Sequence, residues 1–352
     1  MKVKKIQVRE FTAFENVEIE FSPGLNVFIG ANATGKSHLM KLLYSIIKAA
    51  EQRPGRPSHV SPDDQLKEKL ANVFMPDKGE IGRLVRRTRG RKKAIARLGL
   101  GDWAASLELT TLGRLHLEWP GPPPAKRCIF VPSRETLAMF DGFIGTYDRR
   151  EISIDETYYD LCVALSAKPL RGPRRGDIAS LLRPLEHILG GRVVLEGGRF
   201  HVAAADGFIE AHLLAEGFRK IAGLAHLIAN GSLMQNGLLF WDEPEANLNP
   251  KLVTRVAETL RTLTRGGVQV FIATHDFLLS HELSLAAEYE TPPRVPMRFF
   301  AFSRADKGPV TIESGETLAE LTHNPILEEF AAHYDREHAL FRQAGAAGRK
   351  PG

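Results

Sequence analysis

The stretch 25–39, LNVFIGANATGKSHL, contains the pattern that decides the fold. Residues 27–29 are an apolar, β-forming run, and apolar residues recur at helical spacing over 38–49. Between them, residues 30–37 fit G-x-x-x-x-G-K-[ST], a loop whose backbone N–H groups surround a phosphate. The following helix directs the positive end of its dipole at the same anion. The sequence therefore predicts a strand, a phosphate-binding loop and a helix, with a nucleotide as ligand.

Two residue types in this loop carry specific phosphate chemistry. Lys36 is expected to reach the β- and γ-phosphates, and the Ser37 hydroxyl is expected to coordinate Mg²⁺. A chance match in a glycine-rich turn is the alternative, and the flanking strand and helix argue against it. The loop residues predicted to contact the nucleotide are Gly30, Asn32, Ala33, Thr34, Gly35, Lys36 and Ser37.

Two acidic residues end a second apolar strand. Residues 237–244 read GLLFWDEP, so Asp242 and Glu243 follow a buried run directly. We expect Asp242 to hold the Mg²⁺ shell and Glu243 to polarise the attacking water. The alternative is a strand followed by an ordinary acidic turn, which the presence of a phosphate loop disfavours. A further apolar strand, 268–274, ends in His275.

Composition describes an ordinary globular protein with ample core. The chain has 352 residues, of which 43 % are hydrophobic and 25 % charged. A net charge of +5 permits nucleic acid or an acidic partner without specifying either. Cys128 and Cys162 lie in apolar surroundings and are predicted to be reduced core residues, which suits the cytoplasm. No apolar run is long enough to span a bilayer and no secretory signal is evident, so we expect no membrane partner.

Alternation and punctuation predict the other elements. Strands are expected at 2–9 and 16–21, a buried strand at 128–135, and a hairpin around Gly197 and Gly198. Helices are expected from the phosphate loop to about 52, at 64–74 and at 325–343, with helices and loops over 136–190. A β-meander is expected within 80–120, and further strands in RFFAFSRA and PVTIES near the end. The tail, 344–352, is predicted to be disordered.

The segment 83–97 is strongly basic. Two interpretations remain open: it could grip the phosphates of DNA or RNA, or it could be a solvated, charged hairpin. A second basic spot follows at Arg171, Arg174 and Arg175. The basic residues of the first segment are Arg83, Arg86, Arg87, Arg89, Arg91, Lys92, Lys93 and Arg97.

The opening wording, IQVREFTAFENVEIEFSPGLNVFIGANATGKS, resembles the structural-maintenance-of-chromosomes (SMC) and DNA-repair ATPases and the overcoming-lysogenization-defect (OLD) family. The later wording WDEPEANLNP is similar to that of OLD-like ATPases. This resemblance implies an α/β fold, a P-loop NTPase of the ABC-ATPase head type. It implies a mixed central sheet with an antiparallel β lobe and a helical lobe, and ATP with Mg²⁺ as cofactors.

The resemblance also implies a second half of the site. Residues 212–220, HLLAEGFRK, resemble the ABC signature L-S-x-G-x: Leu214, Glu216 and Gly217 fit its spacing, but Ala215 replaces the serine. Asn247 would belong to the D-loop and His275 would be the switch histidine that contacts the γ-phosphate. By position alone, Ser133, Arg134 and Glu135 would lie in a loop near Mg²⁺. Matching proteins hold ATP between two heads, which implies a head-to-tail homodimer.

The predicted organisation is a head at 1–280, with insertions at 80–120 and 136–190, completed by strands and a helix at 281–352. No second catalytic constellation follows residue 281. The leading hypothesis is therefore a dimeric, OLD-like regulatory ATPase in a prokaryotic anti-phage defence module, with a separate nuclease or toxin as effector. The alternative is a DNA-repair clamp that binds DNA through 83–97. A third hypothesis is a nucleotide-binding scaffold that hydrolyses ATP very slowly, which the replacement of the signature serine by Ala215 suggests.

Overall fold

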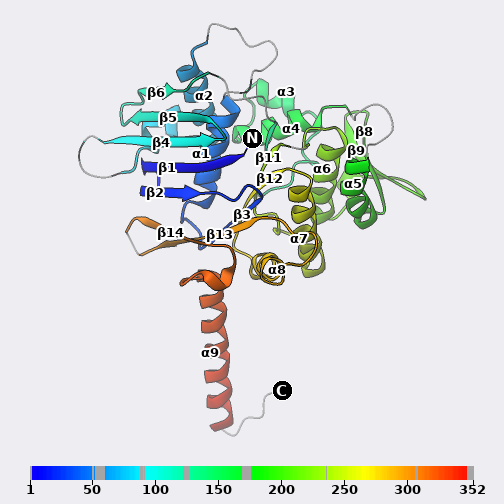
Figure 1. Cartoon of the computed structure of the whole chain (residues 1–352). Coiled ribbons are helices and arrows are strands. Elements are labelled where there is room, and N and C mark those ends of the chain that lie inside the picture. Colours follow the sequence, from blue (N-terminus) through cyan, green and yellow to red (C-terminus); the bar gives the residue numbers. More distant parts are fainter. Residues whose placement is uncertain are drawn as a thin grey trace.

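The computed structural model describes residues 2–49, 51, 60–87, 90, 92–121, 127–168, 176–234, 236–305 and 308–346. Its centre is a six-stranded mixed sheet with the order β14-β13-β3-β12-β11-β7 (Figure 1). The neighbours are parallel except β14, which is antiparallel to β13. The strands are β3 (Leu25–Gly30), β7 (Cys128–Val131), β11 (Leu238–Asp242), β12 (Gln269–Thr274), β13 (Met297–Arg304) and β14 (Val310–Gly315).

A second sheet is antiparallel throughout, with the order β2-β1-β4-β5-β6. The predicted meander joins the first hairpin in this one sheet, because β4 pairs directly with β1. Helix α1 (Lys36–Ala49) follows the phosphate loop, and α2 (Pro62–Phe74) is capped by the Ser61 hydroxyl, which accepts from Asp64 N. The strands are β1 (Val3–Phe11), β2 (Phe14–Glu20), β4 (Lys93–Leu100), β5 (Trp103–Thr110) and β6 (Leu115–Glu118).

Two hydrophobic cores lie on opposite faces of the central sheet. In β3, Val27 and Ile29 belong to one core and Phe28 to the other, because successive side chains point to opposite faces of a strand. The core around Phe28 joins the central sheet to α1 and to the antiparallel sheet. Parallel strands covered on both faces need continuous apolar runs, which is why these strands were visible in the sequence.

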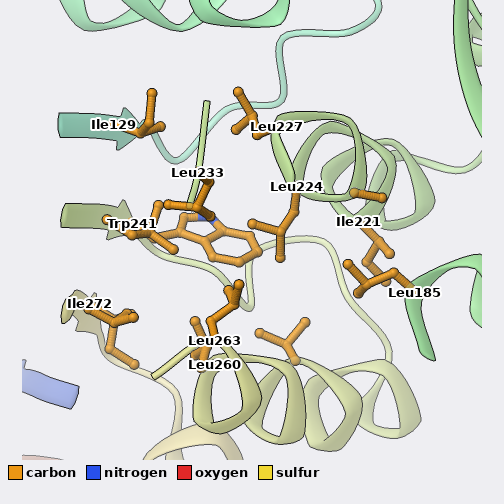
Figure 2. Close-up of a cluster of buried hydrophobic side chains, with 14 of the residues drawn as sticks. Ile129, Leu185, Ile221, Leu224, Leu227, Leu233, Trp241, Leu260, Leu263 and Ile272 are labelled. Atoms are coloured by element: carbon orange, nitrogen blue, oxygen red, sulfur yellow. The ribbon is translucent and has the colours of Figure 1, made fainter. Parts of the chain in front are cut away.

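The other face is covered by helices. Trp241 of β11 is 1 % exposed and packs between α6 and α7, with Leu224 and Leu263 among its neighbours in this cluster (Figure 2). The helices in this part of the chain are α3 (Phe143–Asp148), α4 (Glu156–Leu165), α5 (Gly176–Leu189), α6 (Glu216–Ala229), α7 (Pro250–Arg265) and α8 (Phe277–Glu288). Of these, α3, α4 and α5 fall within 136–190, where helices and loops were expected.

A small sheet of β8 (Gly191–Glu196), β9 (Arg199–Ala204) and β10 (Gly207–Glu210) precedes α6. The predicted hairpin is confirmed, with Gly197 and Gly198 at positive φ, and β10 is an additional strand that the sequence did not predict. The last helix, α9 (Pro325–Ala346), extends away from the rest of the chain (Figure 1). Short 3₁₀ turns are η1 (Asp77–Gly79), η2 (Ile81–Leu84), η3 (Ala211–Leu213) and η4 (Leu318–Glu320).

Several boundaries differ from prediction. Helix α1 ends at Ala49 rather than near 52, and α9 continues to Ala346, past the predicted start of the tail at 344. The rest of that tail, 347–352, lies outside the described residues. Cys128 and Cys162 are buried free thiols, as predicted. Over the described part of the chain, none of the helices has the length and apolar character to cross a bilayer.

Candidate nucleotide-binding and hydrolysis site

The phosphate loop connects the carboxyl end of β3 to α1, and its glycines are required by close contacts. Gly30 has φ 145°, and a Cβ there would lie 2.3 Å from Phe302 O in β13. Gly35 has φ 95°, and its Cβ would lie 2.7 Å from the ring of Phe14 in β2. Both distances are shorter than real Cβ contacts allow, and both φ values disfavour side chains. The loop is therefore fixed between the two sheets.

Lys36 lies inside this loop. Its ammonium donates to Gly30 O at 2.7 Å and Ala31 O at 2.9 Å, and the residue is 9 % exposed. Burial lowers the pKa of Lys36, and the charges of Asp242, Glu243 and Glu245 act in the opposite direction. The ammonium can still donate a further hydrogen bond. A cation held this way, beside backbone N–H groups, fits the β- and γ-phosphates of a nucleotide.

Ser37 and Asp242 meet across the sheet. The Ser37 hydroxyl donates to Asp242 Oδ1 at 3.0 Å, although the two residues are far apart in sequence. Burial raises the pKa of Asp242, while the Ser37 hydrogen bond opposes the shift. A hydroxyl and a carboxylate are hard oxygen donors of the kind that hold Mg²⁺ at the phosphates in P-loop NTPases. These two residues therefore fit the predicted metal site.

Glu243 follows Asp242 in a strained backbone conformation. It has φ 48°, which non-glycine residues rarely adopt, and its N–H donates to Ala273 O at 2.9 Å. Its carboxylate lies 3.4 Å from Nδ1 of His275, the residue that follows β12. The two side chains are 37 % and 52 % exposed, so both reach solvent. An acid beside a histidine at the end of two neighbouring strands can orient and deprotonate a water.

A cavity of about 900 Å³ lies next to these residues, within the size range of ligand pockets. It is lined by residues 32–38 of the loop and helix, by Asp242 and Glu243, and by the turn residues Thr12 and Ala13. Its remaining lining comes from the last residue of α2, the segment after it, and β13. Those residues are Phe74, Pro76, Asp77, Arg83, Leu84, Val85, Arg86, Arg87 and Arg304.

Basic residues of the segment 83–97 line the cavity, pair with carboxylates, or do both. Arg83 pairs with Asp77 at 3.0 Å, Arg86 with Glu15 at 2.9 Å, and Lys93 with Glu108 at 3.0 Å. Lys92 pairs with Glu10. Arg87 and Arg97 are exposed. Arg89 and Arg91, together with the second basic spot at Arg171, Arg174 and Arg175, lie outside the described residues.

The residues implied by the signature motif lie elsewhere. Ala215 is the N-cap of α6 and forms no side-chain cap, and Gly217 is buried in the first turn. A Cβ on Gly217 would lie 2.5 Å from Leu248 Cδ2 and 3.2 Å from Asn247 O. Asn247, at φ 64°, donates from Nδ2 to Glu216 Oε1 at 2.7 Å. Neither Leu214 nor any of these residues lines the phosphate-loop cavity.

Two buried charged residues at the site were missed. Glu245 accepts a hydrogen bond from the Thr274 hydroxyl at 2.7 Å, and burial raises its pKa. Lys220 of α6 donates to the backbone oxygen of Glu243 at 3.3 Å, and burial lowers its pKa. Glu245 ties the turn after β11 to β12, and Lys220 ties the same turn to α6. Glu245 could have been found in the sequence, because it is the third acid of WDEPEAN and stands two residues after Glu243.

The loop after β7, for which a place near Mg²⁺ was implied, contacts the start of α6. Glu135 forms a 2.8 Å ion pair with Arg219 of α6, and Arg219 also donates to Leu214 O at 2.6 Å. Neither Ser133 nor Arg134 nor Glu135 lines the phosphate-loop cavity. This loop therefore supports the start of α6.

Two family models match separate parts of the chain. Residues 1–96 match one described as "AAA ATPase domain", and residues 132–280 match one described as "AAA domain, putative AbiEii toxin, Type IV TA system". Together they include the phosphate loop, the signature-like segment, the acidic strand and the histidine strand.

Curated relatives match over shorter stretches. The "DNA replication and repair protein RecF" of Streptococcus uberis is 43 % identical over 53 residues, 15 % of each chain. The protein of the same name from Lactococcus lactis subsp. lactis is 22 % identical over 140 residues, 37 % of this chain and 38 % of that protein. The chain thus aligns with 15–38 % of the length of these two relatives.

Solved structures match the whole fold. An SMC head bound to the C-winged helix domain of ScpA has a TM-score of 0.55 at 14 % identity, covering 90 % of this chain and 98 % of that one. An SMC head with an extended coiled coil, bound to the C-terminal domain of ScpA and derived from Pyrococcus furiosus, has a TM-score of 0.51 at 13 % identity, with 94 % and 99 % covered. The fold is that of an ABC-type P-loop ATPase head, and the chain is an ATP-binding ATPase.

Proposed function

We propose that ATP and Mg²⁺ bind in the 900 Å³ cavity beside the phosphate loop and that Glu243 activates the attacking water. The observation that carries the proposal is the convergence of Lys36, Ser37, Asp242 and Glu243 on this one cavity. Backbone N–H groups of residues 30–37 and the Lys36 ammonium bind the phosphates. Ser37 and Asp242 hold Mg²⁺, which when bound neutralises charge developing on the phosphate oxygens.

His275 has a positioning role in this mechanism. Its Nδ1 lies 3.4 Å from Glu243, so it can orient that carboxylate and contact the terminal phosphate from the same place. The strained φ of Glu243 and the hydrogen bond from Lys220 to its backbone oxygen fix the direction of the side chain. Proton transfer to Glu243 then needs only the arrival of an aligned water.

The second half of the site comes from another copy of the chain. Leu214, Glu216, Gly217 and Asn247 lie together but outside the cavity of their own chain. A head-to-tail homodimer would bring them to the phosphates of the other copy, where the N-terminus of α6 favours an anion. Since Ala215 provides no hydroxyl, this half would bind phosphate through backbone N–H groups alone. If that binding were very weak, the chain would be a nucleotide-binding scaffold that hydrolyses ATP slowly.

The cellular role proposed for this dimer is regulatory. The likeness to OLD-family wording and the toxin–antitoxin description of the model matching 132–280 support a defence module with a separate nuclease or toxin as effector. In this proposal residues 1–280 form the head and 281–352 complete it, since β13 and β14 extend the central sheet. The effector would respond to ATP-driven association of two heads.

The second candidate is a DNA-repair clamp, favoured by the RecF match and by the exposed Arg87 and Arg97. Those arginines would contact DNA phosphates, so binding would weaken steeply with salt. Replacing Arg97 with glutamine would weaken that salt-dependent binding while leaving ATP binding intact, because Arg97, unlike Arg87, does not line the nucleotide cavity. A chain with no salt-dependent DNA binding leaves the regulatory role as the better account.

The deciding experiment is light scattering on Glu243→Gln at sub-micromolar protein concentration, with and without ATP and Mg²⁺. We expect the molar mass to double with ATP, because the variant binds nucleotide but cannot clear it. Adding Lys36→Ala to the Glu243→Gln variant should remove the doubling. Glu258→Gln in the otherwise wild-type chain is the matched control, because it makes the same substitution at an exposed acid away from the site. A molar mass that does not change when ATP is added would contradict a site built from two chains.

A further inference from the structure

An ion pair between Lys41 of α1 and Asp155 lies next to the residues that fit the metal site. The Lys41 ammonium donates to Asp155 Oδ2 at 2.9 Å and to Val73 O of α2 at 3.3 Å. The two side chains of the pair are only 20 % and 17 % exposed. Neither residue lines the phosphate-loop cavity. The pair can therefore act on a bound nucleotide or metal only through other residues.

Lys41 is close to the carboxylate proposed to hold Mg²⁺. It follows Ser37 by four residues, so the two side chains share one face of α1. The Ser37 hydroxyl donates to Asp242 Oδ1 at 3.0 Å, which brings Asp242 to that face. Burial raises the pKa of Asp242, the Ser37 hydrogen bond opposes the shift, and the charge of Lys41 opposes it more than that of Lys36 does. Lys41 thus acts on Asp242 more strongly than the lysine of the phosphate loop.

Asp155 is held at the start of α4 by contacts that do not depend on the ion pair. It is the N-cap of that helix, and its Oδ1 accepts from the backbone N–H of Thr157 at 3.0 Å. Further along α4, Asp160 accepts from the hydroxyl of Tyr44 in α1 at 2.6 Å and pairs with Lys69 of α2 at 2.7 Å. These contacts keep α4 packed on α1 and α2 when the charge of Asp155 is removed.

A lysine beside a metal-binding carboxylate competes with the metal unless another group holds it. An ammonium carries a positive charge and three donors on a flexible four-carbon stem, so it can pair with Asp242 in place of a cation. Pairing with Asp155 directs the ammonium of Lys41 elsewhere and balances its charge. Replacing such an outer partner of a metal ligand commonly lowers metal affinity about 10- to 100-fold.

We propose that Asp155 is a positioning residue that holds Lys41 away from Asp242 and so keeps Asp242 free to bind Mg²⁺. The inference rests on the proposed function, because it concerns the metal of that same site. It makes the two members of the ion pair unequal: loss of the Asp155 charge weakens metal binding, whereas loss of the Lys41 charge does not. An ion pair that only stabilises the fold would respond in the same way from both sides.

The test compares the affinity for a fluorescent ATP analogue in excess Mg²⁺ and in EDTA, at sub-micromolar protein concentration. We expect Mg²⁺ to tighten binding to the wild type about tenfold or more. Asp155→Asn should bind about tenfold more weakly in Mg²⁺ without weakening in EDTA, since asparagine still caps α4 and only the charge is lost. Lys41→Gln should keep the tightening by Mg²⁺, and the double variant should regain it.

Two controls separate charge from folding. Asp155→Asn and Lys41→Gln break the same ion pair, so urea unfolding should show comparable losses of stability while the responses to Mg²⁺ differ. Glu108→Gln is the matched control, because it removes the carboxylate of the 3.0 Å pair with Lys93 in the antiparallel sheet, away from the cavity. It should leave both affinities unchanged.

The outcomes that overturn the inference are distinct from those that overturn the site. Equal weakening in Asp155→Asn and Lys41→Gln, or a double variant that is not rescued, would mean that the pair has only a structural role. Unchanged affinity of Asp155→Asn in Mg²⁺ would overturn this inference alone. A wild-type chain that binds the analogue equally with Mg²⁺ and with EDTA would overturn the metal site of the proposed function and this inference with it.

Discussion

The phosphate-loop half of the site and the signature half differ in how much one chain completes. In the first, Lys36 and Ser37 of α1 meet Asp242 and Glu243, at and just after the end of β11, around one cavity. In the second, the first turn of α6 and the turn after β11 contact each other through Gly217 and the Asn247–Glu216 hydrogen bond, and neither Gly217 nor Asn247 lines that cavity. One half surrounds a cavity within a single chain, whereas the other, in the proposed dimer, would meet the nucleotide bound by a second chain.

The electrostatics of the two halves differ in the same way. Burial lowers the pKa of Lys36 and raises that of Asp242, so both charged forms are disfavoured by loss of water. Bound phosphate and metal would restore favourable partners to both residues. Asn247 is exposed and its contact with Glu216 remains in water. In the proposed mechanism the first half would therefore be stabilised by ligand directly, and the second would be stabilised only when two chains meet.

The largest expected effect is on the chemistry of the first half. Glu243→Gln should reduce ATP hydrolysis by about 10²- to 10⁴-fold, because it removes the group that accepts the proton of the attacking water. Binding of ATP should persist. Turnover by phosphate release is the measurement, with Glu258→Gln as control for loss of an acid elsewhere. An unchanged rate would place the catalytic base at another residue.

The next effect tests whether the first half binds alone. ATP with Mg²⁺ at 100 times its dissociation constant should stabilise the folded chain by about 2.7 kcal/mol. The measurement is urea unfolding at protein concentrations too low for association. Lys36→Ala should lose this stabilisation, because the loop keeps its glycines but lacks the cation. If stabilisation appears only at concentrations that form dimers, the two halves are not separable.

The sequence predicted which residues of the first half lie together, and the arrangement of the second half only in part. The phosphate loop, Asp242 and Glu243 follow from local patterns, because a strand, a loop and a helix that are contiguous in the chain need little else. Lys220 and Glu245 could not be placed, since their roles depend on how α6, β11 and β12 pack. The central sheet was expected from apolar runs, but the pairing of β4 with β1 is a long-range contact that alternation alone does not reveal.

A smaller effect is expected from adding a single methyl group to the signature half, which should lower hydrolysis without weakening ATP binding. Gly217→Ala brings a Cβ to 2.5 Å from Leu248 and should displace the turn holding Asn247, at a cost of about 1–3 kcal/mol. Hydrolysis should fall roughly tenfold or more while low-concentration ATP binding is kept. Gly223→Ala is the matched control on the same helix, because its Cβ would meet only Leu137 at 3.9 Å. Equal losses in both variants would indicate general damage to α6.

The smallest expected effect concerns the missing hydroxyl. Ala215 is the N-cap of α6 and forms no side-chain hydrogen bond, so Ala215→Ser should stabilise the chain by about 1 kcal/mol through capping. Urea unfolding without nucleotide measures the stabilisation by capping. The rate of ATP hydrolysis at dimer-forming concentrations measures whether the hydroxyl also contacts nucleotide across two chains. A several-fold faster rate with unchanged low-concentration ATP binding would mean that the serine acts across two chains. Stabilisation with no change in rate would mean that the hydroxyl only caps its own helix, and the signature half would then work through backbone N–H groups alone.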